Sequence, residues 1–146
     1  MRPAKHVIIS SGVALIIYGW LHSWLCAFSC LITGVLIDID HAFDYFFTHK
    51  RIPLNFKELD NFCQYDIYGK ISLIFHSYEL VIALWIVYSF FNIEALLGIA
   101  VGATVHLLCD LIANPFKFRS YLLLYRHYHK YERKKFYVDG FFEDKK

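Results

Sequence analysis

The chain alternates long apolar stretches with shorter polar ones, and this pattern predicts helices that cross a membrane. Between Val7 and Ile37 the sequence contains no Asp, Glu, Lys or Arg. One helix of that length would extend about 45 Å, which exceeds the ~30 Å hydrocarbon core of a bilayer. Gly, Ser, His and two Trp residues interrupt the aliphatic pattern between Gly19 and Trp24. We therefore expect two short helices that are joined there as a hairpin.

Two further apolar segments follow later in the chain. One runs from about Ile71 to Phe91, and the other runs from about Ala95 to Ala113 and stops just before Pro115. Gly98 and Gly102 in the second segment form a small-xxx-small pattern, which allows two helix backbones to approach closely. These segments predict a third and a fourth membrane helix.

The remaining segments are polar and aromatic. Residues 42–70 predict a loop with a short interfacial helix, in which Pro53 limits regular structure. Residues 117–146 are basic and rich in Tyr and Phe, which predicts an interfacial helix on the membrane surface. We expect an all-α polytopic membrane bundle of about four transmembrane helices. Residues 1–116 would form the membrane-embedded domain, and 117–146 a cytoplasmic or interfacial tail.

Composition and charge agree with a multi-pass membrane protein. Hydrophobic residues make up 58% of the chain and the mean hydropathy is +0.40, above the usual values for soluble domains. With four crossings, every Lys and Arg lies on the side of the two termini and the 42–70 segment, whereas the opposite turns carry only Glu94. The positive-inside rule then predicts a cytoplasmic (inner) membrane location with both termini in the cytoplasm. Membrane lipid is the expected partner, and no nucleic acid is expected.

Ionisable residues inside apolar segments are candidates for function, because they are costly in a membrane unless they are used. Eight of them are candidate metal ligands: His6, Asp38, Asp40, His41, His76, Glu79, His106 and Asp110. They lie near the start of the first and third helices and the end of the second and fourth. An up-down-up-down bundle brings all four groups to the same depth on the cytoplasmic side.

The spacing of these residues suits a metal site. Three pairs have a spacing of three or four residues, which on a helix projects both side chains from one face: His106–Asp110, His76–Glu79 and Asp38–His41. Facing helices of a bundle build metal sites from such pairs. Imidazole and carboxylate ligands favour Zn²⁺, with Mn²⁺ or Fe²⁺ as alternatives, over Ca²⁺. One ion or more can be held, and a two-metal site would suit hydrolysis of a phosphate ester.

Simpler interpretations remain open for several of these residues. His106 and Asp110 could form a structural hydrogen-bonded pair, and His6 could be an ordinary interfacial residue. Asp44 lies beyond the expected helix end, where solvation would explain it. His22 lies on the opposite side of the expected bundle and is interpreted as unrelated, and the histidines of the tail at 127 and 129 fit a surface helix.

Four short motifs resemble a known family. These are KHV at 5–7, LIDIDH at 36–41, HSYE at 76–79 and HLLCDLIANP at 106–115. Together they are similar to the LexA-regulated inner-membrane metal-dependent hydrolases, which more distantly resemble zinc-dependent phospholipase C. The resemblance implies a helical metal-dependent phosphoesterase with these ligands: His6, Asp38, Asp40, His41, His76, His106 and Asp110. Ile37 replaces the usual Pro of the second motif. Ile71 stands where many members have His, and Glu79 would replace that missing ligand.

We therefore expect a membrane-bound metal-dependent hydrolase that acts on a phosphate ester such as a lipid headgroup. Asp38 or Asp40, whichever is not fully engaged with metal, would orient or deprotonate the attacking water. Lys50 and Arg51, with the basic tail, would attract anionic headgroups. The alternative is a non-catalytic membrane protein whose His/Asp cluster binds a metal or holds the bundle together. A di-iron lipid oxidase ranks last, because HYH at 127–129 is a poor match to its histidine-rich boxes.

Overall fold

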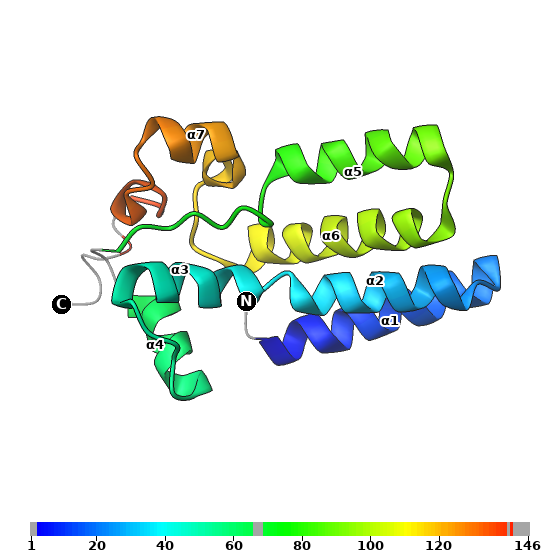
Figure 1. Ribbon diagram of the computed structural model, residues 1–146, viewed down its shortest axis with the longest axis horizontal. Helices are drawn as coiled ribbons and strands as arrows, with labels where there is room; N and C mark the ends of the chain where they lie inside the picture. The colour runs from blue at the N-terminus through cyan, green and yellow to red at the C-terminus, as the bar shows by residue number, and fades with distance from the viewer. Residues whose placement is uncertain (1–2, 66–68, 140, 142–146) are drawn as a thin grey trace. The chain divides into compact units, whose positions relative to one another are not determined.

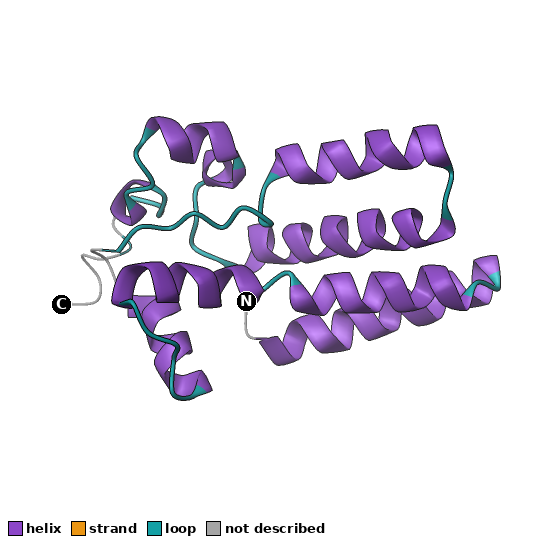
Figure 2. Ribbon diagram, in the orientation of Figure 1, coloured by secondary structure: helices purple, strands orange, loops and turns teal. Residues whose placement is uncertain are grey.

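The computed structural model describes residues 3–65, 69–139 and 141, and all its regular secondary structure within them is helical (Figures 1 and 2). The predicted all-α fold is thus confirmed. The chain forms two compact units, each assembled from segments that are distant in sequence. The first unit contains residues 1–38 and 78–114, and the second contains 39–77 and 115–146. The expected division of the chain into a membrane-embedded domain, residues 1–116, and a tail, residues 117–146, stays a prediction.

The first unit is a bundle of four helices in which helices consecutive in this unit run in opposite directions (Figure 1). Its members are α1 (Pro3–Leu21), α2 (Trp24–Leu36), α5 (Tyr78–Phe91) and α6 (Glu94–Ala113). Helix α2 packs against both α1 and α6, and α6 also packs against α5 (Figure 1). Each hairpin turns through one residue with positive φ, His22 or Asn92. Ser23 then caps α2 by accepting a hydrogen bond from the Cys26 N–H, so the predicted hairpin within residues 7–37 is confirmed.

Three helical segments are long and apolar enough to cross a membrane. They are Ala4–Leu21, Trp24–His49, which joins α2 to the following helix, and Glu94–Ala113. The fourth apolar helix, Tyr78–Phe91, has 14 residues, about 21 Å, which is shorter than a ~30 Å hydrocarbon core. The expected start of this helix at Ile71 is wrong, because residues 71–77 are not helical. The chain nevertheless has the helices of a membrane protein.

Glycines bring the backbones of α2 and α6 into direct contact. A Cβ atom on Gly98 would overlap the carbonyl oxygen of Cys26, and one on Gly102 would overlap that of Cys30. Gly34 of α2 makes a similar contact with Ser10 of α1. The small-xxx-small pattern therefore performs the role predicted from the sequence, which is close helix packing without large side chains.

The second unit contains shorter helices. They are α3 (Ile39–His49), α4 (Phe56–Tyr65), η1 (Phe118–Tyr121), α7 (Leu123–Tyr128) and η2 (Arg133–Lys135). The short helix expected within residues 42–70 corresponds to α4, and its interfacial location stays a prediction. Helix α3 is an additional helix. The expected single surface helix in 117–146 is wrong. The described tail is a series of short helices because Lys130 and Tyr131 adopt positive φ after α7.

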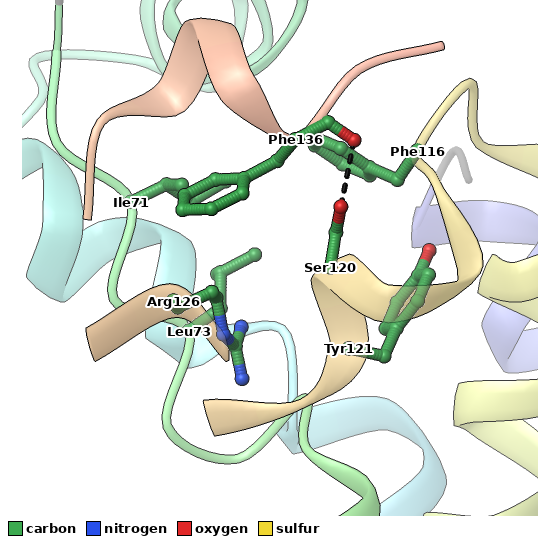
Figure 3. Close-up of a pocket in the computed structure, with 7 residues that line it drawn as sticks. All are labelled: Ile71, Leu73, Phe116, Ser120, Tyr121, Arg126 and Phe136. Atoms are coloured by element: carbon green, nitrogen blue, oxygen red, sulfur yellow. Dashed lines mark hydrogen bonds between the residues drawn. The ribbon is translucent and has the colours of Figure 1, made fainter. Parts of the chain in front are cut away.

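The tail of the second unit packs on the segment that precedes α5. Ile71, Leu73 and Phe136 form a small buried apolar cluster, and the carbonyl of Phe136 accepts a hydrogen bond of 2.7 Å from the Ser120 hydroxyl (Figure 3). Two isolated β-bridges, Lys70–Glu132 and Phe116–Tyr137, extend this contact. Burial of aromatic and aliphatic side chains therefore packs the basic tail onto the segment around residues 70–73 within the second unit.

Arg133 joins the tail to α4. Its buried guanidinium donates hydrogen bonds to the carbonyls of Phe62 (2.7 Å) and Cys63, which belong to the last turn of α4. The same group lies 5.1 Å from the centre of the Phe62 ring. A cation at a helix C-terminus also interacts favourably with the helix dipole.

Glu58 fixes the connection between α3 and α4. Its carboxylate accepts hydrogen bonds from the Tyr45 hydroxyl (2.5 Å), the Leu54 N–H (2.7 Å) and the Arg51 guanidinium. Asn55 completes the N-terminus of α4 by accepting from the Glu58 N–H at 2.9 Å. These bonds, led by that from Tyr45, lower the pKa of Glu58 to about 2.

Substitution of Gly98 or Gly102 by Ala should destabilise the first unit by about 1–3 kcal/mol, because the new methyl group forces α2 and α6 apart. Gly12→Ala is the matched control in α1, where an added Cβ meets nothing within 4 Å. It should leave stability unchanged or raise it by up to about 1 kcal/mol. The test is thermal unfolding of the detergent-solubilised protein by circular dichroism. Equal unfolding temperatures for all three variants would contradict the packing account.

The connection between α3 and α4 should loosen in acid. Because the pKa of Glu58 is lowered in the folded chain, its hydrogen bonds stabilise the connection fully above the ordinary pKa of 4.5 and are lost as pH falls through about 2. The readout is the exchange protection of the Leu54 amide, corrected for the intrinsic effect of pH. Protection in Glu58→Gln should be weaker and should not change across this range. A Leu54 amide equally protected in both proteins would refute the role of Glu58.

Candidate metal centre

The close contact of three helices determines where the polar residues of the first unit meet. Ser10 of α1, Gly34 of α2 and Gly102 of α6 lie at one level of the bundle, where an added Cβ on Gly34 would touch Ser10 and lie near the Gly102 carbonyl. One helical turn further along lie the three polar residues His6, Asp38 and His106, each four positions from a member of this layer. Small residues in one layer thus force the side chains of the next layer together.

His6, Asp38, His106 and Asp110 form one compact group. The Nε2 atom of His6 lies 3.1 Å from Oδ1 of Asp110 and 4.0 Å from Oδ2 of Asp38. The Nε2 atom of His106 lies 3.4 Å from Oδ1 of Asp38 and 3.5 Å from Oδ2 of Asp110. One ligand atom from each of the four residues fits within a 4.8 Å span, so together they could hold a metal ion.

A backbone carbonyl fixes the orientation of His106. Its Nδ1 lies 2.8 Å from the carbonyl oxygen of Gly34, which can only accept a hydrogen bond, so Nδ1 carries the proton. The other ring nitrogen, Nε2, then points at the carboxylates of Asp38 and Asp110. The ring of His6 stacks on that of His106, with centroids 3.8 Å apart and an angle of 12°. Metal-binding histidines are commonly oriented by a hydrogen bond from the second ring nitrogen to a carbonyl group.

The group requires a positive charge. Two carboxylates in a buried setting carry two negative charges, and a neutral His106 would direct a lone pair at both of them. Either protons on the imidazoles or a bound cation can balance this charge. A divalent cation does so with four nitrogen and oxygen ligands, so the residues fit a metal ion.

A second set of polar residues lies within the second unit, on α3 and the segment 71–77. Oδ2 of Asp40 accepts a hydrogen bond from the Phe75 N–H at 2.5 Å and lies 3.3 Å from Nδ1 of His76. One turn later, Oδ2 of Asp44 accepts from the N–H groups of Ser72 (2.8 Å) and Leu73 (3.3 Å). Two acids on one face of α3 therefore hold the backbone of the segment that leads to α5.

Arg126 and His41 complete the surroundings of His76 in this unit. The guanidinium of Arg126 is buried and donates a 3.1 Å hydrogen bond to the His76 carbonyl. The ring of His41 lies 5.2 Å from that of His76. Of the sequence-predicted residues, Asp40, His41 and His76 thus belong to the second unit, and Glu79 lies half-buried in the first turn of α5.

Three expectations about these residues are wrong. His76 precedes α5, so His76 and Glu79 do not share a helix. Asp38 lies in the turn between α2 and α3, which removes it from the helix that carries His41. Asp44 is not solvated but 4% exposed, because the amides of segment 71–73 use its carboxylate. The recurrence of Asp at positions 40 and 44, one helical turn apart, was the signal in the sequence that Asp44 lies on the same buried face as Asp40. The carbonyl of Gly34 and the side chain of Arg126 left no comparable signal in the sequence.

Comparison with known proteins adds no assignment: no family model matches the chain, and neither a curated protein nor a solved structure matches it significantly.

Removal of the Asp44 carboxylate should release the segment before α5. Asp44→Ala leaves the amides of Ser72 and Leu73 without their acceptor, a loss of about 1–3 kcal/mol for a buried donor. Faster hydrogen exchange at residues 72–73, measured by mass spectrometry, is the expected result. Asp44→Asn retains one acceptor oxygen and should show a smaller change, and Asn61→Ala on the exposed face of α4 should show none. Unchanged hydrogen exchange at residues 72–73 in Asp44→Ala would contradict the role of Asp44 in holding this segment.

Proposed function

We propose that this protein is a membrane-bound metal-dependent hydrolase of phosphate esters, with a lipid headgroup as the preferred class of substrate. The observation that carries the proposal is the buried group of two imidazoles and two carboxylates in which the Gly34 carbonyl aims Nε2 of His106 inward. The sequence motifs that resemble inner-membrane hydrolases support the same function. The distribution of Lys and Arg supports a cytoplasmic-membrane location with both termini and the group on the cytoplasmic side.

His6, His106 and Asp110 would be the enclosed ligands, and Asp38 would lie beside the ion as the fourth member of the group. This donor set suits zinc, with manganese or iron as alternatives. A divalent cation held there lowers the pKa of a water molecule that it binds, to about 7 for zinc, and polarises a phosphoryl oxygen. The chain itself supplies the orientation of both rings and a largely dry environment, in which charge interactions are stronger than in water.

Asp38 is the best candidate for the carboxylate that accepts a proton from the attacking water. Its side chain is 19% exposed, whereas that of Asp110 is 2% exposed, so water reaches Asp38 more readily. A carboxylate that contacts both the site and solvent is suited to general base catalysis.

Asp40 has a different role in this proposal. The same oxygen, Oδ2, contacts the Phe75 N–H and Nδ1 of His76, which makes Asp40 a positioning residue for the His76 ring. Of the two acids expected to serve the attacking water, Asp38 is therefore the one that we propose. The proposed division of roles assigns proton transfer to Asp38 and orientation to Asp40.

The alternative function is a non-catalytic His/Asp cluster that stabilises the bundle or only stores metal. The contacts of 3.1–3.5 Å between ring nitrogens and carboxylates favour it, because protonated imidazoles would form hydrogen-bonded ion pairs at these distances. Turnover separates the two functions, and metal content separates metal binding from a purely proton-balanced cluster.

The experiment measures metal content and hydrolysis in the purified, detergent-solubilised protein. Asp110→Ala should abolish both while the protein still inserts into the membrane, because the enclosed group loses a charge and a ligand. Asp38→Asn should keep most of the metal and lower kcat by about 10²-fold or more on a chromogenic phosphodiester and on phosphatidylglycerol in mixed micelles.

The matched control is His22→Ala, which removes an exposed histidine at the α1–α2 turn. It should change neither metal content nor kcat. Metal retained in Asp110→Ala would overturn the ligand assignment, and bound metal without turnover in the wild type would favour the non-catalytic alternative.

A further inference from the structure

The connection between α3 and α4 presents two bare aliphatic side chains to the outside. Ile52 is 75% exposed and Leu54 is 85% exposed, with Pro53 between them. Phe47, in the last turn of α3, is 63% exposed as well. Apolar side chains gathered in a short polar connection mark a surface that another phase or molecule covers.

Hydrogen bonds hold the α3–α4 connection in a defined conformation. Glu58 accepts hydrogen bonds from the N–H of Leu54 and from the side chains of Tyr45 and Arg51. Pro53 restricts the backbone further, since its ring fixes φ. Ile52 and Leu54 therefore point outward without a large loss of conformational entropy when they are covered.

Positive charge flanks the apolar side chains. Arg51 pairs with Glu58, but Lys50 and Lys57 are exposed, and the ammonium of Lys50 lies 5.9 Å from the centre of the Phe47 ring. Aliphatic and aromatic groups combined with lysines match the boundary between acyl chains and anionic headgroups. A purely apolar protein interface would not require these cations.

The position of the α3–α4 connection in the chain indicates that a membrane covers these apolar side chains. The candidate membrane span Trp24–His49 ends one residue before Lys50, so the connection begins where a crossing segment would leave the hydrocarbon. Residues directly after a span lie at the interface, where aromatic side chains and lysines anchor proteins.

We propose that Phe47, Ile52 and Leu54 form an interfacial anchor that inserts into the headgroup–acyl boundary of an anionic bilayer, with Lys50 and Lys57 beside the lipid phosphates. This anchor is independent of the proposed hydrolysis. It assigns the α3–α4 connection to the membrane surface and identifies anionic lipid as its binding partner.

The test uses nitroxide labels on the full chain in vesicles of phosphatidylcholine with phosphatidylglycerol. Labels are attached at Ile52→Cys or Leu54→Cys in a background where the partly exposed Cys63 and Cys109 are replaced by Ala. Collision with oxygen, which concentrates in the bilayer, is compared with collision with a water-soluble nickel chelate. Labels at 52 and 54 should show an oxygen-to-nickel ratio several-fold above that of Asn61→Cys, an exposed polar site on α4.

Two further measurements separate an anchor from simple apolar exposure. Glu58→Gln should lower the ratio at positions 52 and 54 by releasing the connection, and Lys50→Gln with Lys57→Gln should lower it in anionic vesicles but not in pure phosphatidylcholine. Ratios at 52 and 54 equal to that at 61 in anionic vesicles would overturn the proposal. So would ratios that rise only when the chain self-associates, because a second copy would then be the covering partner.

Discussion

The backbone contact between α2 and α6 is the constraint on which the rest of the first unit depends. Gly98 and Gly102 leave no room for a side chain against the carbonyls of Cys26 and Cys30, so the two helices lie as close as backbones allow. This approach brings the ring of His106 within hydrogen-bonding distance of the Gly34 carbonyl. A wider helix spacing would break that bond and, with it, the inward direction of Nε2. The site is thus a consequence of packing by the smallest residues in the bundle.

Electrostatics then limits what the site can be. Asp38 and Asp110 face two imidazoles in a region from which water is largely excluded, and buried charge without compensation is costly. Protons or a cation must supply the compensation. A cation would contact several side chains of the group at once, whereas protons require only pairwise contacts. The hydrogen bond from Nδ1 of His106 to a backbone carbonyl directs Nε2 towards the carboxylates, an arrangement that is common among metal-binding histidines.

The sequence predicted the bundle well and the site in part, and the physical reasons differ. Uninterrupted apolar runs and the break at Gly19–Trp24 indicate helix lengths directly, and the spacing of Gly98 and Gly102 indicates close packing. His106 and Asp110 share a helix, so their four-residue spacing was sufficient to predict that their side chains lie together. His76 was expected at a helix start, but hydrogen bonds from backbone N–H groups to Asp40 and Asp44 hold its segment in a non-helical conformation. Such long-range side chain to backbone contacts have no period in the sequence and could not be foreseen.

X-ray absorption of the purified protein, loaded with one equivalent of zinc and freed of excess, tests the central claim most directly. The account predicts a shell of four nitrogen and oxygen ligands at about 2.0–2.2 Å, with the outer scattering of two imidazoles and no sulfur. His106→Ala should reduce the imidazole contribution to one or release the zinc. A protein that retains no zinc, or a shell with sulfur at about 2.3 Å from cysteine, would contradict the account.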